Sequence, residues 1–331
     1  MGQPIVRYES GQTSYAFEAM TDSGDQTNFT ASFSPMSRVS GYAPTVAPYG
    51  LKTGGVITAA SGNDKVDVAA LTVVAPGMTG ADADGVVTVS ADTDIATYRG
   101  VTTDTHMITS ITVDATGAIA SITGTDNTAF STTRGDPGGP PYIPVGSVEI
   151  GQVRTTSVTA AVVASGEIYQ VPGLHLERSD YPTYEVDYAN GEITFVDALP
   201  AIHTGDVPKK VYIDGATPLF APVPKASEWV PAEATYSISS TDTYDGPIGS
   251  SSSSLGQASF SAVLTDGITD NFVSLKGANI WIEFRPDRDV TVPKQLTQGI
   301  FGISRTFPAG GGSVSASCTV TPVEATVDVA S

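Results

Sequence analysis

Histidine and carboxylate side chains are the first candidates for chemistry in this sequence. The chain has three histidines, His106, His175 and His203, and none of them has a second histidine at the spacing of metal ligands. His175 and Glu177 stand two residues apart, so a strand would place both side chains on one face, where a metal or a general base could use them. The sequence around them supplies no third and fourth ligand. We therefore interpret them as a surface pair at a strand end, and we expect neither a metal nor a cofactor.

Aspartates form two clusters ten residues apart in the first third of the chain. Asp82 and Asp84 make up the first cluster, and Asp92 and Asp94 the second. Oxygen-rich loops of this kind can bind Ca²⁺, but the EF-hand spacing is absent and aspartate is an ordinary turn residue. As an acid–base pair for glycoside hydrolysis they are poorly supported, because no aromatic platform for a sugar lies near them in the sequence. We interpret both clusters as solvated turns.

Nucleophilic and phosphate-binding motifs are missing from the sequence. It contains no Gly-x-Ser-x-Gly elbow on a strand-to-helix turn, no P-loop and no Gly-x-Gly-x-x-Gly. Cys318 is the single cysteine, which excludes a disulfide within the chain and a cysteine-based zinc site. It stands in an alternating run, residues 314–320, where a small buried side chain is expected rather than a reactive thiol. We predict that the chain is not an enzyme.

The charge content of the chain bears on its partners. Only 15% of the 331 residues are charged, and a surface poor in charge is typical of a protein largely covered by neighbouring subunits. The net charge is −19 and Lys209-Lys210 is the only basic pair, so binding to DNA is not expected. The N-terminal residues show no apolar signal-peptide core, and no run is long enough for a membrane helix. These patterns predict a protein made in the cytoplasm, with no membrane partner.

Alternation with a period of two dominates the sequence and predicts a mainly β fold. Its 34 glycines and 22 prolines punctuate many short strands. Residues 184–196 form the clearest hairpin, with Asn190-Gly191 as a type I′ turn, and residues 108–122 form a second one around the turn 114–117.

Four strands are predicted in the C-terminal third, and their spacing favours a β-sandwich or barrel. They cover residues 258–264, 278–284, 300–307 and 314–320. A short helix is expected within 265–275, with Asp266 or Thr269 as its N-cap. We expect at most one or two short helices in the whole chain.

Segments rich in Pro, Gly or Ser predict loops and linkers. Residues 135–144 cannot hold a sheet ladder, and the domain boundary is placed there, which gives an N-terminal β domain with an extended arm at 1–145 and a C-terminal β-sandwich at 146–331. Residues 38–49 and 216–231 are proline-rich and predict extended connectors, and residues 241–256 contain a run of five serines that predicts a loop.

Three parts of the sequence resemble a known family. Residues 135–145 and 148–154 are similar to a segment of the major tail proteins, or tail-tube proteins, of Mu-like long-tailed phages that infect Pseudomonas. Residues 168–173, with Arg178 and 180–182, continue the likeness, and the strands from residue 258 onward suit the sandwich of a tail tube. These motifs are structural rather than catalytic.

The resemblance implies a virion protein that assembles in the host cytoplasm into stacked rings, forming a hollow tube through which DNA is ejected. Its main partner would be itself, as a trimeric ring with pseudo-sixfold symmetry in preference to a hexamer. Tail terminator, tape measure and distal tail proteins would be further partners, and DNA would pass without specific binding. An acidic lumen is the natural expectation, because carboxylates repel phosphate. The candidate lumen acids are Asp82, Asp84, Asp92, Asp94 and Asp104.

Two other functions stay open at the level of sequence. A phage tail-tip or fibre protein, or another β-rich host-binding protein, would bind a ligand on the host surface and would not grow into tubes. An enzyme such as a polysaccharide depolymerase would need a catalytic carboxylate pair, which the sequence does not nominate. A capsid decoration protein is a further structural possibility.

Overall fold

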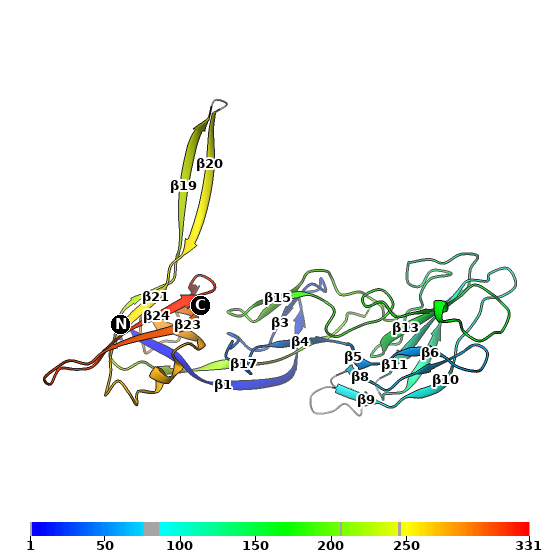
Figure 1. The fold of residues 1–331 in the computed structure, drawn as a ribbon, viewed down its shortest axis with the longest axis horizontal. Coiled ribbons are helices and arrows are strands. Elements are labelled where there is room, and N and C mark those ends of the chain that lie inside the picture. Colours follow the sequence, from blue (N-terminus) through cyan, green and yellow to red (C-terminus); the bar gives the residue numbers. More distant parts are fainter. Residues whose placement is uncertain (1, 76–85, 115, 206, 244–245, 331) are drawn as a thin grey trace.

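A computed structural model describes residues 2–75, 86–114, 116–205, 207–243 and 246–330. The prediction of a mainly β fold is confirmed: the chain forms several antiparallel sheets, and helical structure in the described residues is limited to two short 3₁₀ turns, η1 (Ser165–Glu167) and η2 (Asn271–Leu275). Figure 1 shows an elongated molecule, with both termini near one end and a long hairpin projecting from that end.

A nine-stranded sheet forms the end of the molecule that holds both termini. Its strand order is β18-β21-β24-β23-β22-β1-β17-β4, and β25 also pairs with β23. The strands are β1 (Ile5–Ala19), β4 (Thr45–Pro48), β17 (Val211–Pro222), β18 (Ala226–Val230), β21 (Ala258–Val263), β22 (Asn279–Arg285), β23 (Lys294–Thr306), β24 (Ser315–Pro322) and β25 (Val327–Val329). The four predicted C-terminal strands are therefore confirmed, as β21 to β24.

The core beneath this sheet follows from the alternation of its strands. Along β21 buried and half-buried residues alternate, so Phe260 is buried with its neighbours two residues away on the same face. Phe272, Phe301 and Cys318 join the same cluster, and each is at most 2% exposed. Cys318 is thus a buried core residue, as the sequence predicted.

Strands β1 and β17 connect this end to the rest of the molecule. They pair with each other from Arg7↔Pro222 to Ala19↔Tyr212, and they run along the long axis in Figure 1. Beside them lies a four-stranded sheet, β15-β16-β3-β2, made of β2 (Thr21–Asp22), β3 (Asn28–Thr30), β15 (Tyr184–Asp187) and β16 (Glu192–Phe195). A second core, with Phe29, Phe195 and Ile213, packs between them.

The end of the molecule away from the termini, here called the distal region, contains three further sheets around a third core that includes Ile111, Val153 and Leu176. Their strand orders are β5-β8-β9, β10-β7-β6 and β12-β11-β13-β14. The strands are β5 (Gly50–Gly54), β6 (Ile57–Ala59), β7 (Lys65–Val68), β8 (Leu71–Val74), β9 (Val86–Val89), β10 (Asp92–Ala96), β11 (Met107–Val113), β12 (Ile119–Thr123), β13 (Val148–Thr155) and β14 (Ile168–Tyr169).

The boundary expected at residue 145 falls inside the distal region. β11 and β13 lie on either side of it in the sequence and pair antiparallel, from Met107↔Thr155 to Val113↔Val148. The Pro- and Gly-rich segment is a loop, as predicted, but it joins two strands of one sheet rather than two domains. The chain instead contributes β1 and β4 to the nine-stranded sheet before the distal region and returns to this sheet through β17, so the N- and C-terminal segments share one sheet.

Two predicted connectors contain strands. Residues 216–231 contribute to β17 and β18, and residues 38–49 contain β4. The prolines of β17 are tolerated because β4 pairs only with its first four residues, Val211 to Asp214, which leaves one edge free along the proline-containing part.

The serine run is likewise a strand rather than a loop. β19 (Ala234–Thr243) and β20 (Gly246–Leu255) form the projecting two-stranded hairpin of Figure 1, in register from Ala234↔Leu255 to Thr243↔Gly246. Hydroxyl groups stabilise it across the strands: Thr235 Oγ1 and Ser254 Oγ lie 2.9 Å apart, and Ser237 Oγ and Ser252 Oγ 2.8 Å apart.

Both predicted hairpins are confirmed, and one turn differs from its prediction. β11 and β12 pair around the expected turn. β15 and β16 also pair, but the closing pair is Asp187↔Glu192, so the loop has four residues instead of the two of a type I′ turn. Asp187 determines this, since its carboxylate accepts from the backbone of Ala189 and Asn190, and Gly191 supplies the positive φ of 72°. The predicted short helix is the 3₁₀ turn η2, and its N-cap position is held by Asp270, not by the predicted Asp266 or Thr269.

Candidate functional site

The candidate lumen acids lie on the surface of the distal region or outside the described residues. Asp82 and Asp84 are outside the described residues. Asp92 and Asp94 are exposed on β10, and Asp104 is half-buried in the loop that follows. The carboxylate of Asp94 lies 3.4 Å from Lys65 Nζ. That these acids line a channel stays a prediction.

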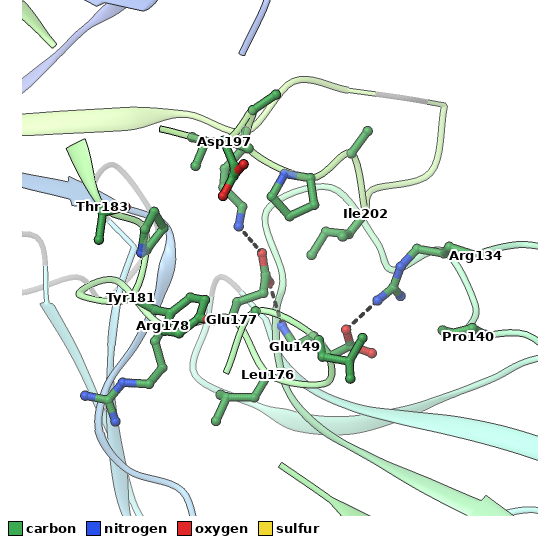
Figure 2. Close-up of a pocket in the computed structure, with 18 of the residues that line it drawn as sticks. Arg134, Pro140, Glu149, Leu176, Glu177, Arg178, Tyr181, Thr183, Asp197 and Ile202 are labelled. Atoms are coloured by element: carbon green, nitrogen blue, oxygen red, sulfur yellow. Dashed lines mark hydrogen bonds and ion pairs between the residues drawn. The ribbon is translucent and has the colours of Figure 1, made fainter. Parts of the chain in front are cut away.

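A cavity of about 630 Å³ opens where the distal region meets the four-stranded sheet β15-β16-β3-β2, and it gathers charged residues that the sequence keeps apart (Figure 2). β13 supplies Glu149, the segment after β14 supplies Glu177, and Lys209 precedes β17. The loop that links β12 to β13 adds Arg134, and the loop after β16 adds Asp197.

Glu177 is at the centre of this arrangement. One carboxylate oxygen, Oε1, lies 2.5 Å from Lys209 Nζ, and the other accepts a hydrogen bond of 2.8 Å from the backbone N–H of Glu149. Lys209 and Glu177 are 5% and 7% exposed, so the ion pair is buried. The sequence interpretation of Glu177 as a surface residue was wrong, because the segment that carries it folds against β13 and β5 instead of ending at the surface.

Glu149 is buried more completely than Glu177 and is held by three side chains. Ser110 and Gln152 donate to its Oε1, and the guanidinium of Arg134 lies 2.5 Å from its Oε2. Burial raises the pKa of Glu149, and Arg134 opposes this rise. With its oxygens engaged in this way, Glu149 anchors the wall of the cavity.

The rim of the cavity combines a closed ion pair with exposed apolar groups. Arg178 donates two hydrogen bonds of 2.7 Å to Asp180. Tyr181 is 55% exposed and lies against Gly173, where a Cβ would come within 2.3 Å of the tyrosine ring. Leu174, which follows Gly173 in the sequence and also lines the cavity, is 63% exposed.

His175 and His203 are both buried, and in each the Nδ1 atom has no hydrogen-bond partner among the described residues. The His175 ring packs 5.2 Å from that of Tyr169, on which the guanidinium of Arg154 also rests. Burial, assisted by the positive charge of Arg154, lowers the pKa of His175 to about 4. The imidazole is therefore neutral at physiological pH, and its role is packing.

A second buried carboxylate lies in the nine-stranded sheet, away from the cavity. Glu283 on β22 is fully buried, and Arg7, Arg285 and Lys294 lie 2.8, 2.8 and 3.2 Å from its oxygens. Hydrogen bonds from the two arginines lower its pKa against the opposing effect of burial. The group joins β1, β22 and β23, so its role is to hold these strands in register.

No group of three or more His, Cys, Asp or Glu residues in the described parts of the chain is arranged to hold a metal ion. None of the helical segments there has the length and apolarity needed to cross a membrane.

Sequence reasoning missed Arg134, Glu149 and Lys209. One signal could have indicated Glu149: it stands between Val148 and Ile150 in a strand whose residues are almost all buried, and a carboxylate in such a strand must have a partner. No family model matches the chain, and neither a curated protein nor a solved structure matches it.

Proposed function

We propose that this chain is a self-assembling structural subunit of the tail-tube type, forming stacked rings that enclose a conduit for DNA. The observation that carries the proposal is the hairpin β19–β20. It projects from the body at the end that holds the nine-stranded sheet, and its strands pair with no others in the described structure (Figure 1).

The surface of the hairpin is unusual for a part exposed to water. Tyr236 and Ile238 are 78% and 84% exposed, and with Leu255 they lie on one face, while the other face carries the hydroxyl ladder. A two-stranded ribbon in water is at best marginally stable by itself. Burial of the apolar face against another surface would stabilise it.

The backbone edges of the hairpin support a second copy of the chain as that partner. Exposed edges normally carry charges, prolines or bulges that block pairing with another strand. The edge strand β18 of the large sheet is blunted in this way, with a register shift and a positive φ at Glu228. β20 carries no charged residue, and its one proline, Pro247, is its second residue, so residues 248–255 contain neither a charge nor a proline. Strand addition by this hairpin is therefore favoured as the assembly contact.

The charge of the chain fits the conduit. At −19 the protein repels phosphate, and only 16 of its residues are Lys or Arg. Five of these, at positions 7, 134, 209, 285 and 294, neutralise buried carboxylates and are not available to DNA.

Sedimentation velocity on matched variants tests the assembly contact. The double substitution Tyr236→Ser and Ile238→Ser should abolish concentration-dependent association and leave a folded protomer, because these side chains contact no core. Ser237→Ala together with Ser252→Ala, on the opposite face, is the control and should assemble. If the first variant associates as the wild type does, the hairpin is not the contact.

A further inference from the structure

We infer that the cavity beside Glu177 and Lys209 is a binding site for a neutral, hydroxyl-rich ring, such as one residue of a glycan. The inference is independent of assembly. It rests on three features: the size of the cavity, the closure of its ion pairs, and the hydrogen-bonding capacity that remains unused.

The cavity has the dimensions and lining of a ligand site. Its volume of about 630 Å³ lies within the range of roughly 300–1,000 Å³ typical of small-molecule pockets. Apolar side chains form about half of the wall, and the polar and charged side chains come from separate segments. The apolar part includes Leu174, Leu176, Leu199, Ile202 and Pro182.

The buried charges in the wall are neutralised before any ligand arrives. Lys209 pairs with Glu177, and Arg134 with Glu149. Arg178 at the rim pairs with Asp180. An anionic ligand would have to compete with one of these counter-charges, at the cost of separating a buried pair, and a cationic ligand would meet only the exposed carboxylate of Asp197, whose attraction water screens. A neutral ligand avoids this cost.

Hydroxyl groups match the hydrogen-bonding capacity that is left. An ammonium group has three donors, and among the described residues Lys209 Nζ has Glu177 as its only partner. Two donors of a side chain that is 5% exposed thus remain to be satisfied, which is costly in a buried site. A pair of adjacent hydroxyls can accept from the two remaining donors of Lys209, whereas an apolar ligand would leave these donors unsatisfied.

The rim offers a surface for the C–H face of such a ring. Tyr181 packs closely against Gly173, since any Cβ at residue 173 would collide with the ring, and more than half of the tyrosine remains exposed. Asp197 lines the same cavity and is exposed, with no ion-pair partner among the described residues, so it adds an acceptor for a hydroxyl at the mouth.

Saturation-transfer NMR and calorimetry on the full chain test the inference. The probes are D-glucose, D-galactose, N-acetyl-D-glucosamine and L-rhamnose, with D-glucosamine and D-glucuronate as charged counterparts. We expect saturable binding of at least one neutral sugar. Absence of binding for all four up to about 10 mM, tenfold above an affinity of 1 mM, would overturn the inference. It would also be overturned if glucosamine or glucuronate bound tenfold more tightly than every neutral sugar.

Matched tyrosine variants locate the site. Tyr181→Ala should weaken binding at least tenfold and leave the fold intact. Tyr142→Ala is the control: Tyr142 also lies against a glycine, Gly135, and is also exposed, but it does not line the cavity. Equal losses in the two variants, or none in Tyr181→Ala, would place the binding elsewhere. The monomeric hairpin variant should bind as the wild type does, which separates this test from that of assembly.

Discussion

Removal of the Lys209 ammonium should destabilise the distal region far more than removal of the whole Lys209–Glu177 pair. Lys209→Met keeps the length of the side chain and leaves the carboxylate of Glu177, 7% exposed, without its counter-charge. Adding Glu177→Gln removes that charge, and the amide oxygen can still accept from the backbone N–H of Glu149, as Oε2 does in the wild type.

The magnitude follows from the burial of the pair. Loss of one partner of a buried ion pair costs about 3–5 kcal/mol, because the remaining charge is uncompensated, whereas replacement of both is often close to neutral. We therefore expect Lys209→Met to lower the free energy of unfolding of the distal region by about 3 kcal/mol or more. The double variant should recover most of this loss.

Hydrogen exchange measures the effect where it occurs. At about 1.4 kcal/mol per tenfold change, the amides of β11 and β13 should exchange roughly a hundredfold faster or more in Lys209→Met. Tryptophan fluorescence is a control, since Trp229 and Trp281 lie on β18 and β22 of the nine-stranded sheet. A loss below about 1 kcal/mol in the single variant, or a double variant no more stable than the single, would refute the reasoning.

Acid should weaken the distal region through His175. Burial lowers the pKa of its folded state to about 4 from the ordinary 6.5, so between these pH values the unfolded chain binds a proton that the folded chain does not. The stability present above pH 6.5 is therefore progressively lost as the pH falls to 4. Urea unfolding followed by exchange in β13 should show this slope, and His175→Asn should reduce it; an unchanged slope would contradict the assignment. Cys318, fully buried and with a pKa raised to about 12 by burial, should react with a thiol reagent only on unfolding. Labelling of the native chain at the rate of a free thiol would show that the core opens. Phe301→Ala should lower the free energy of unfolding by about 3–5 kcal/mol, since the phenylalanine is 1% exposed in the core of the large sheet. Urea unfolding followed by Trp229 fluorescence measures this loss, and a value below about 1 kcal/mol would contradict the packing of Phe301.

The parts of the fold that could be predicted from sequence are those set by local pattern. β21 and β24 alternate cleanly, and the two hairpins have turn residues between alternating arms, so local chemistry and tertiary pairing agree there. The predictions for the proline-rich and serine-rich segments were wrong, because long-range strand pairing determined their structure. Pro218 stands in a strand because only one of its edges is paired, and the serine run forms a strand because Ser252 and Ser254 meet hydroxyls across the ribbon.

The cavity lay beyond sequence reasoning for a different reason. Its ion pairs join segments that no local pattern connects. Glu177, in the segment after β14, pairs with Lys209, just before β17, and Glu149 pairs with Arg134 at the other end of the Pro- and Gly-rich loop. The spacing of His175 and Glu177 indicated the segment that lines the cavity, but the burial of this segment gives the two residues different roles. Glu177 forms an ion pair, while His175 is neutral and packed against Tyr169.

Electron microscopy of the concentrated full-length protein in negative stain tests the central proposal of a self-assembling tube subunit most directly. The account predicts rings, or tubes of uniform bore, whose abundance grows with protein concentration, with threefold or sixfold symmetry in end views. The variant with Tyr236→Ser and Ile238→Ser should show separate protomers under the same conditions. A wild-type protein that stays strictly monomeric at every concentration and salt would contradict the account.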